Sequence, residues 1–419
     1  MIARRAADKW EQIFHNTHES IQMAIQFESA QNFDKILDRL NKYCPGLHYG
    51  SDGKYIFKTN NKVSVYKLPD QYNNLAELSN LMFFKHTQPL DQSLMQIGIN
   101  KDAMVLNINH IASDGMFLHK IFDVIKSEDE ITTIPQIVAT EKQFEKEIKE
   151  YTGRKIPFFS VDHSLTRIHP KIKQEFHSNM KSANNLSYTD SKNLMTTKIN
   201  GKVSQMTENF WISVILSTFA FNDKIDKAGA CTMVNLRPFL QSFKDTEVTC
   251  SFSSVAVTSD VSESMEVSEL MKSLRKNFEE RIKNKEYIGF IKSLPDENTI
   301  FDTFLGLGLD ISLIQKFKLN DKMNDLYIGL NEADFGFSDL LSITGYSVEK
   351  DGTNKIMSNV KFSPTTLGEL EGKVLSRSII FGLESIHPDM TVKKAVELLQ
   401  EYQNGLQKTL ESPIIKYLD

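Results

Sequence analysis

The stretch from residue 104 to residue 125 constrains the fold most, because its apolar pattern changes from that of a strand to that of a helix within a few residues. Up to His110 the residues alternate between two faces, as in a β-strand. One face carries Met104, Leu106, Ile108 and His110, and the other carries Val105, Asn107 and Asn109. Beyond the change, apolar residues recur at helical spacing, at Phe117, Ile121, Val124 and Ile125. The pattern predicts a strand, a short turn and a helix.

His110 stands where this strand ends, four residues ahead of the pair Asp114-Gly115. Asp114 is well placed to cap the helix, and Gly115 allows a tight backbone. Three interpretations of His110 are open: a catalytic base, a metal ligand, or a buried polar residue. Ligands at i and i+4 converge when both lie on a helix, and His110 is expected on a strand, so its position disfavours a metal site.

Strand-like and helix-like segments mix in both halves of the 419-residue chain, which favours an α/β fold. A helix is expected at 32–43, strands within 54–109, a solvated helix within 139–151 and a linker at 157–192. In the second half, the pattern of apolar residues predicts helices at 210–221, 268–284 and 391–411, and strands near 230–237, 249–260, 325–336 and 375–384. We expect two domains, 1–175 and 176–419.

Composition narrows the classes of function. The formal net charge is −5, which disfavours nucleic-acid binding. Three widely spaced cysteines, Cys44, Cys231 and Cys250, form no CxxC pair and suggest a reducing, cytoplasmic setting. No secretory signal or apolar membrane span is predicted. Trp10, Ile13 and Phe14 share one helical face, which favours packing on the protein and is compatible with peripheral contact with a membrane or lipid droplet.

Two later segments add to the histidine motif. "VNLRPFL" places Arg237 just after a predicted strand, where a buried arginine needs a carboxylate partner, and Asp114 is the obvious candidate. "NEADFGFSD" supplies a DFG turn, Asp334, Phe335 and Gly336, after another strand. A kinase is excluded, because the chain has neither a glycine-rich loop nor an HRD catalytic loop.

The order of these segments resembles the CoA-dependent acyltransferase superfamily, which includes chloramphenicol acetyltransferase, plant BAHD acyltransferases, fungal alcohol acetyltransferases and the condensation domains of peptide synthetases. "LNINHIASDGMFLHKIFDVI" is the most specific match, followed by "VNLRPFL" and then "DFGFSD". The resemblance implies two chloramphenicol acetyltransferase-like domains, with mixed sheets, flanking helices and an active-site tunnel at their interface. Within the superfamily, the chain resembles the fungal alcohol O-acetyltransferases most.

By resemblance, His110 is the general base that takes the proton of an acceptor hydroxyl or amine as it attacks an acyl thioester. Asp114, paired with Arg237, and Gly115 would support the site. The candidate tunnel or CoA-side elements are Asn109, Ser253, Ser254, Asn331, Asp334, Phe335 and Gly336, with the two serines and Asn331 as guesses for the oxyanion stabiliser. Two departures stand out: Asn109 replaces the first of the paired histidines found in many relatives, and Phe337-Ser338 replaces the Trp-Gly of plant enzymes.

The leading hypothesis is transfer of an acyl group, with acetyl expected, from acyl-CoA to a small, fairly apolar alcohol or amine. Acyl-CoA would be a co-substrate, and no permanently bound cofactor and no metal are expected. The protein is expected to be a monomer. Two alternatives stay open: a stand-alone condensation-type enzyme with a carrier-protein donor, made less favourable because no carrier segment follows in this chain, and a catalytically silent binding protein of the same fold.

Overall fold

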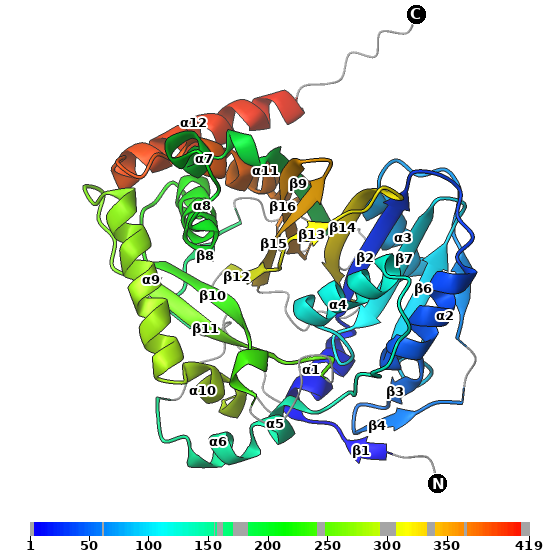
Figure 1. Cartoon of the computed structure of the whole chain (residues 1–419). Helices are drawn as coiled ribbons and strands as arrows, with labels where there is room; N and C mark the ends of the chain where they lie inside the picture. The colour runs from blue at the N-terminus through cyan, green and yellow to red at the C-terminus, as the bar shows by residue number, and fades with distance from the viewer. Residues whose placement is uncertain are drawn as a thin grey trace, which may run out of the picture.

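Two α/β bodies lie side by side in the computed structural model, each a mixed sheet with flanking helices (Figure 1). The structure describes residues 4–60, 63–154, 156, 162–170, 183–240, 248–293, 307–332, 340–363 and 367–411. The mixed α/β fold expected from the sequence is confirmed. The expected division at 175/176 falls outside the described residues and stays a prediction.

The first body is built on a five-stranded sheet in the order β14-β2-β7-β6-β5. These strands are β2 (Ser20–Phe27), β5 (Val65–Lys67), β6 (Met95–Ile99), β7 (Ala103–Asn109) and β14 (Met323–Asn331). β5 is parallel to β6, and the other neighbours are antiparallel. Because β14 comes from late in the chain, this sheet ties the two halves of the sequence together. A small sheet, β1 (Arg4–Ala6), β4 (Tyr55–Lys58) and β3 (Tyr49–Ser51), lies beside it.

Helices bury both faces of β7, whose seven residues are all buried. Met104, Leu106 and Ile108 belong to the core that includes α2 (Asp34–Tyr43) and α4 (Gly115–Lys126), whereas Val105 packs in the cluster with α3 (Leu75–His86). The alternation read from the sequence is therefore confirmed. The helix α1 (Lys9–Thr17) precedes β2 and lies where the two bodies meet (Figure 1).

The second body is built on an eight-stranded sheet in the order β11-β10-β12-β15-β16-β9, with β8 beside β12 and β13 beside β15. The strands are β8 (Arg167–Ile168), β9 (Ala183–Asp190), β10 (Ala228–Asn235), β11 (Phe252–Ser259), β12 (Leu307–Leu313), β13 (Phe317–Lys318), β15 (Leu340–Lys350) and β16 (Thr353–Phe362). β12 is parallel to both β10 and β15.

Long helices cover the outer face of this sheet: α8 (Met206–Asn222), α9 (Val267–Lys283), α11 (Glu369–Ser385) and α12 (Val392–Glu411). Shorter helices are α5 (Thr140–Gln143), α6 (Glu145–Glu150), α7 (Met195–Asn200) and α10 (Glu286–Lys292), with 3₁₀ turns at Pro45–Leu47, Ser191–Asn193 and Arg237–Phe239. The expected helices at 32–43, 210–221, 268–284 and 391–411 are confirmed.

Some expectations from the sequence are wrong. The segment 375–384 is helical and lies inside α11, because its apolar residues Leu375, Ile379 and Leu383 share one face that packs in the second core. The expected linker at 157–192 contains β8, which pairs with β12, and β9, which pairs with β16, and most residues of β9 are half-buried, so its sequence shows no clear buried face. The expected helix within 139–151 is split into α5 and α6.

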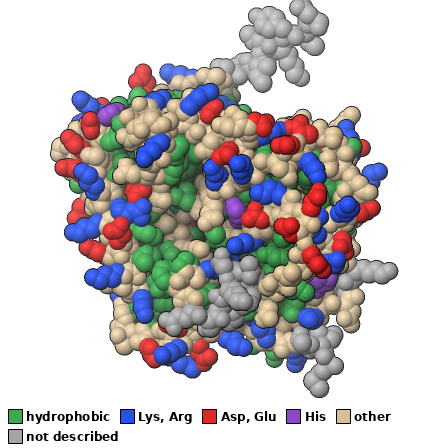
Figure 2. Space-filling model, in the orientation of Figure 1, with side chains coloured by type: hydrophobic (Ala, Val, Ile, Leu, Met, Phe, Trp, Pro, Cys, Tyr) green, Lys and Arg blue, Asp and Glu red, His purple; other side chains and the backbone are tan. Residues whose placement is uncertain are grey.

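Charges of both signs are spread over the face of the molecule that Figure 2 shows, and hydrophobic side chains gather on this face over α8, β10 and β11. Among the described residues, none of the helices has the length and apolar character required to cross a bilayer.

Candidate active site

The turn after β7 holds His110 in a fixed position. Its backbone N–H donates to the carbonyl oxygen of Glu19 at 3.0 Å, which extends the pairing of β7 with β2 by one residue. Asn109 closes the turn: its side-chain oxygen accepts from the N–H of Ile111 at 3.0 Å, and its amide nitrogen donates to the carbonyl oxygen of Phe14 at 3.2 Å. Asn109 thus holds both the turn and α1.

The helix after the turn begins as the sequence predicts. Asp114 is the N-cap of α4, and its Oδ1 accepts from the N–H of Phe117 at 2.8 Å. Gly115 faces Ile314, which comes from the second body. A Cβ built at Gly115 would lie 3.0 Å from Cγ1 of Ile314, so a side chain here would press the two bodies apart.

The pairing expected between Asp114 and Arg237 is present. Nη1 of Arg237 donates to Oδ2 of Asp114 at 2.9 Å, and the two side chains are 4% and 5% exposed. The same carboxylate oxygen accepts from the N–H of Ser251 at 2.7 Å. Nη2 of Arg237 donates to the carbonyl oxygens of Val248 at 3.1 Å and Thr249 at 3.4 Å. The pair therefore fastens the start of α4 to the segment that leads into β11.

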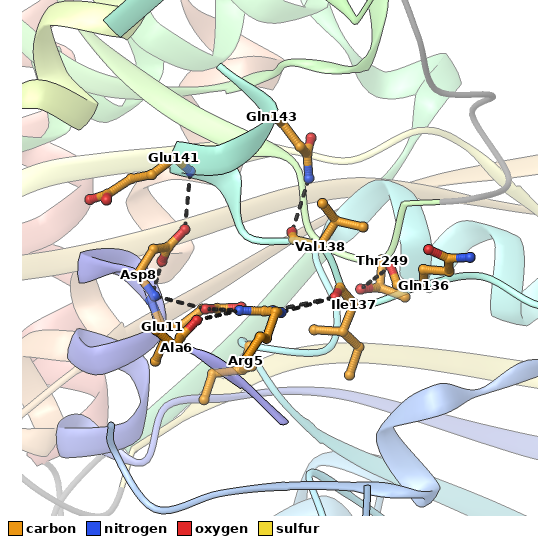
Figure 3. Close-up of polar contacts among 12 residues, drawn as sticks. Arg5, Ala6, Asp8, Glu11, Gln136, Ile137, Val138, Glu141, Gln143 and Thr249 are labelled. Carbon is orange, nitrogen blue, oxygen red and sulfur yellow. Dashed lines mark hydrogen bonds and ion pairs between the residues drawn. The ribbon is translucent and has the colours of Figure 1, made fainter. Parts of the chain in front are cut away.

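A second polar network fixes α1 (Figure 3). Asp8 caps α1 by accepting from the N–H of Glu11 at 2.9 Å, and it accepts from the N–H of Glu141 at 3.1 Å. Burial raises the pKa of Asp8 to about 7. Arg5 forms an ion pair with Glu11 and donates to the carbonyl oxygen of Ile137. These contacts bind α1 to the segment that precedes α5.

That segment is in turn bonded to the residues around the Asp114–Arg237 pair. The hydroxyl of Thr249 donates to the carbonyl oxygen of Gln136 at 3.3 Å (Figure 3). The hydroxyl of Ser251 lies 3.3 Å from Oε1 of Gln143, and Gln143 donates to the carbonyl oxygen of Val138 at 3.0 Å. Helix α1, α4 and the start of β11 thus form one hydrogen-bonded frame around His110.

Aromatic rings enclose the imidazole. The ring of Phe14 stacks on His110 with centroids 4.7 Å apart, and the ring of Phe252 lies 5.0 Å away on a tilt. Trp10 packs against both phenylalanines, at 5.3 and 5.4 Å. His110 is 9% exposed, and its Nδ1 is buried with no hydrogen-bond partner among the described residues. The imidazole therefore lies in a mainly apolar setting, aligned by ring packing.

A cavity of about 130 Å³ lies between the two bodies, and His110 is on its wall. One side is formed by the first body, including Ile21, Gly115 and Met116, and the other by strands β10, β12 and β15 of the second body. The wall is mostly apolar, with polar side chains at a few places. Such a site, an apolar cavity with few convergent polar groups between two bodies, is typical of small-molecule binding.

The other residues singled out in the sequence lie elsewhere. Ser253 donates from its hydroxyl to the carbonyl oxygen of Tyr287 at 2.7 Å, and Ser254 is buried on β11. Asn331 donates to Gln22 at 2.6 Å and accepts from Asn184 at 3.0 Å, in a network between the bodies. Among the described residues, none of these three lines the cavity.

The DFG segment, Asp334, Phe335 and Gly336, lies outside the described residues.

Sequence reasoning missed several residues of the cavity wall. Glu19, Asp310, Ser312, Ser342 and Thr344 all line it. Asp310 is the one that the sequence could have revealed, because it is the one charged residue of the run "LGLDISL", whose leucines and isoleucine form the other, buried face of the strand. The others carry no signal that separates them from ordinary strand residues.

Charged side chains are buried together beside the cavity. Asp310 and Glu19 are each 7% exposed, and Glu332 is 1% exposed. Nζ of Lys361 lies 3.0 Å from Oε2 of Glu332 and 3.8 Å from Oε1 of Glu19. Burial, together with the charge of Glu19, raises the pKa of Asp310 to about 7. Among the described residues, no three His, Cys, Asp or Glu side chains are grouped so that they could hold a metal ion.

No protein-family model matches this sequence, and the comparison with curated proteins finds no match. Solved structures match over almost the whole chain. Polyketide synthase associated protein 5 from Mycobacterium tuberculosis has a TM-score of 0.65 at 13% identity, over 91% of this chain and 98% of that one. The first condensation domain of the calcium-dependent antibiotic synthetase has a TM-score of 0.63 at 9% identity, over 94% and 98%.

A third structure is a mutant of the starter condensation domain of rhizomide synthetase in complex with C8-CoA and Leu-SNAC. Its TM-score is 0.64 at 12% identity, over 93% of this chain and 96% of that domain. Together these similarities show that the chain has the two-domain fold of condensation domains, which is the fold expected of a CoA-dependent acyltransferase.

Proposed function

We propose that this protein is an acyltransferase that moves an acyl group from a thioester, acyl-CoA, to a hydroxyl or amine, with His110 as the general base. The observation that carries the proposal is the position of His110, held by the β7 turn and two aromatic rings on the wall of the cavity between the bodies. An imidazole titrates near neutral pH, so it can take and return a proton under physiological conditions.

The reaction needs a single proton carrier. The imidazole accepts the proton of the acceptor O–H or N–H as the oxygen or nitrogen attacks the thioester carbonyl carbon. The resulting tetrahedral intermediate collapses, the carbon–sulfur bond breaks, and the thiolate of CoA takes the proton from the imidazolium. The histidine ends the cycle neutral, and no covalent enzyme intermediate is required. A positioned general base contributes roughly 10²–10⁴-fold to such a step.

Asp114 acts through the backbone rather than through proton transfer. Its carboxylate accepts hydrogen bonds from Arg237, Ser251 and Phe117, so its oxygens are engaged in the frame. Together with Gly115, which lets α4 approach Ile314, it holds the turn that presents His110. We assign these residues to positioning.

Acyl-CoA is the favoured donor, because the starter condensation domain of rhizomide synthetase, which has the same fold, was solved in complex with C8-CoA. Within this proposal acetyl is the expected acyl group, and a fairly apolar alcohol or amine is the expected acceptor, as in alcohol O-acetyltransferases. A condensation-type reaction, in which the donor is a carrier-protein thioester, is the second candidate, since condensation domains share the fold.

Thiol release separates these possibilities. The purified protein is incubated with acetyl-CoA or octanoyl-CoA and a panel of alcohols and amines, and free thiol and acylated product are measured. The proposal expects thiol release that depends on the acceptor. Transfer from an acyl carrier protein but from neither CoA ester would favour the condensation-type reaction, and no transfer from any donor would refute catalysis.

A further inference from the structure

A group of buried acids lies along the cavity wall, and the proposed proton transfer does not use it. Glu19 and Asp310 both line the cavity, one from the first body and one from β12 of the second. Glu332 follows β14 and is 1% exposed. Lys361 forms ion pairs with Glu332 and Glu19, and the charges of Glu332, Glu19 and Asp310 raise its pKa despite its burial. Two carboxylates thus lie within ion-pair distance of one ammonium group, and the third influences it through its charge.

Of the three acids, Asp310 is the one that forms no ion pair with Lys361 among the described residues. Lys361 lies closest to Glu332, at 3.0 Å, and 3.8 Å from Glu19. Asp310 is 7% exposed, and a hydrogen bond with Ser342 acts on its carboxyl group, but its Oδ1 has no hydrogen-bond partner among the described residues. A buried carboxylate oxygen without a donor is costly, unless the group is protonated or a cation binds beside it.

Strand geometry directs Asp310 toward the cavity. On β12, Leu309 and Ile311 are buried in the core under the helices, so Asp310 and Ser312 occupy the opposite face, where both line the cavity. In the pairing of β12 with β15, Asp310 lies opposite Ser342. Ser342 and Thr344 line the same wall, and their hydroxyl oxygens add neutral hydrogen-bond acceptors.

The geometry points to an acceptor substrate that carries a protonated amine, an aliphatic amino alcohol or diamine whose ammonium group binds Asp310 and Glu19 while its other end reaches His110. This inference rests on the proposed function and names its acceptor class. An ammonium group has three donors, which suits carboxylate and hydroxyl oxygens, and Ile21, Ile314 and Leu330 offer apolar wall for the alkyl chain. An organic cation fits better than a metal ion, because no three His, Cys, Asp or Glu side chains of the described residues are grouped as metal ligands.

Paired acceptors test the inference. The probes are 6-amino-1-hexanol and 1-hexanol, which differ in one ammonium group, with octanoyl-CoA as donor. The measured quantity is the ratio of kcat/KM for the amino alcohol to that for the alcohol. Hydrogen bonds to charged groups contribute about 1.5–3 kcal/mol, so the ratio should exceed tenfold in the natural protein and fall about tenfold in Asp310→Asn and in Glu19→Gln, mainly through KM.

The matched control is Glu208→Gln, which changes a carboxylate that is 5% exposed and paired with Arg275 on the outer helices. Its ratio should equal that of the natural protein. A ratio near one in the natural protein, or an unchanged ratio in Asp310→Asn, would overturn the inference and leave acyl transfer itself intact.

Binding without turnover separates this inference from the proposed function. Calorimetry measures 6-amino-1-hexanol binding to His110→Ala and to His110→Ala/Asp310→Asn, with no donor present. The inference expects binding to the first and at least tenfold weaker binding to the second. Binding that depends on Asp310, together with no transfer by the natural protein from any donor, would support the amine site and refute the acyltransferase, whereas equal binding by the two variants would refute the amine site.

Discussion

Removing Arg237 should destabilise the fold by about 3 kcal/mol. Arg237→Ala leaves the carboxylate of Asp114 buried at 5% exposure without its cation. Breaking a buried ion pair in this way costs about 3–5 kcal/mol. The lower end applies here, because Asp114 keeps the N–H donors of Ser251 at 2.7 Å and Phe117 at 2.8 Å. The carbonyl oxygens of Val248 and Thr249 lose their donor in addition.

Urea unfolding at pH 7 measures this effect, with Lys149→Ala as the matched control. Lys149 pairs with Glu145 at 2.6 Å, but the side chains are 72% and 62% exposed, so its loss should change the free energy of unfolding far less than the loss of Arg237. In an Asp114→Asn background, Arg237→Ala should cost less than in the natural protein, because no buried charge is stranded. Equal unfolding curves for Arg237→Ala and Lys149→Ala would refute the view that this pair holds the frame.

Two further stability predictions follow from the cavity wall and from the contact between the bodies. Burial raises the pKa of Asp310 from 3.8 to about 7, so the folded state binds a proton that the unfolded state has lost, and stability falls as pH rises from about 4 to about 7. Asp310→Asn should therefore match the natural protein near pH 4 and exceed it by up to about 4 kcal/mol at pH 8, measured by urea unfolding, and the opposite order would contradict the direction of the shift. Gly115→Leu should cost about 1–3 kcal/mol, since even a Cβ would lie 3.0 Å from Ile314, and Ile314→Ala should recover part of that cost if the clash is the cause.

Local patterns predict the elements that carry the site, because strand and helix periodicity depend on near neighbours in the sequence. The alternation through Ile108, the cap at Asp114 and the helix after it all appear as expected. The partner of Asp114 could also be predicted, since a buried arginine after a strand requires a carboxylate.

The remainder depends on tertiary contacts that no local pattern encodes. The segment 375–384 is rich enough in isoleucine and leucine to suggest a strand, and its packing in the second core makes it helical. β14 joins the sheet of the first body from late in the chain. Phe14 and Phe252 meet His110 from different bodies, so the aromatic enclosure exists only in the folded molecule.

If His110 alone carries the proton, His110→Ala and His119→Ala should differ sharply in activity. His119 lies on α4, where its Nε2 is 3.0 Å from the carbonyl oxygen of Lys316 and its Nδ1 is 3.4 Å from Asp123, so it has a structural setting away from the cavity wall. The measurement is kcat for acceptor-dependent thiol release from acyl-CoA, with urea unfolding to check that both variants fold. We expect His110→Ala to lower kcat roughly 10²–10⁴-fold and His119→Ala to stay near the natural rate. Turnover in folded His110→Ala close to that of the natural protein would contradict it.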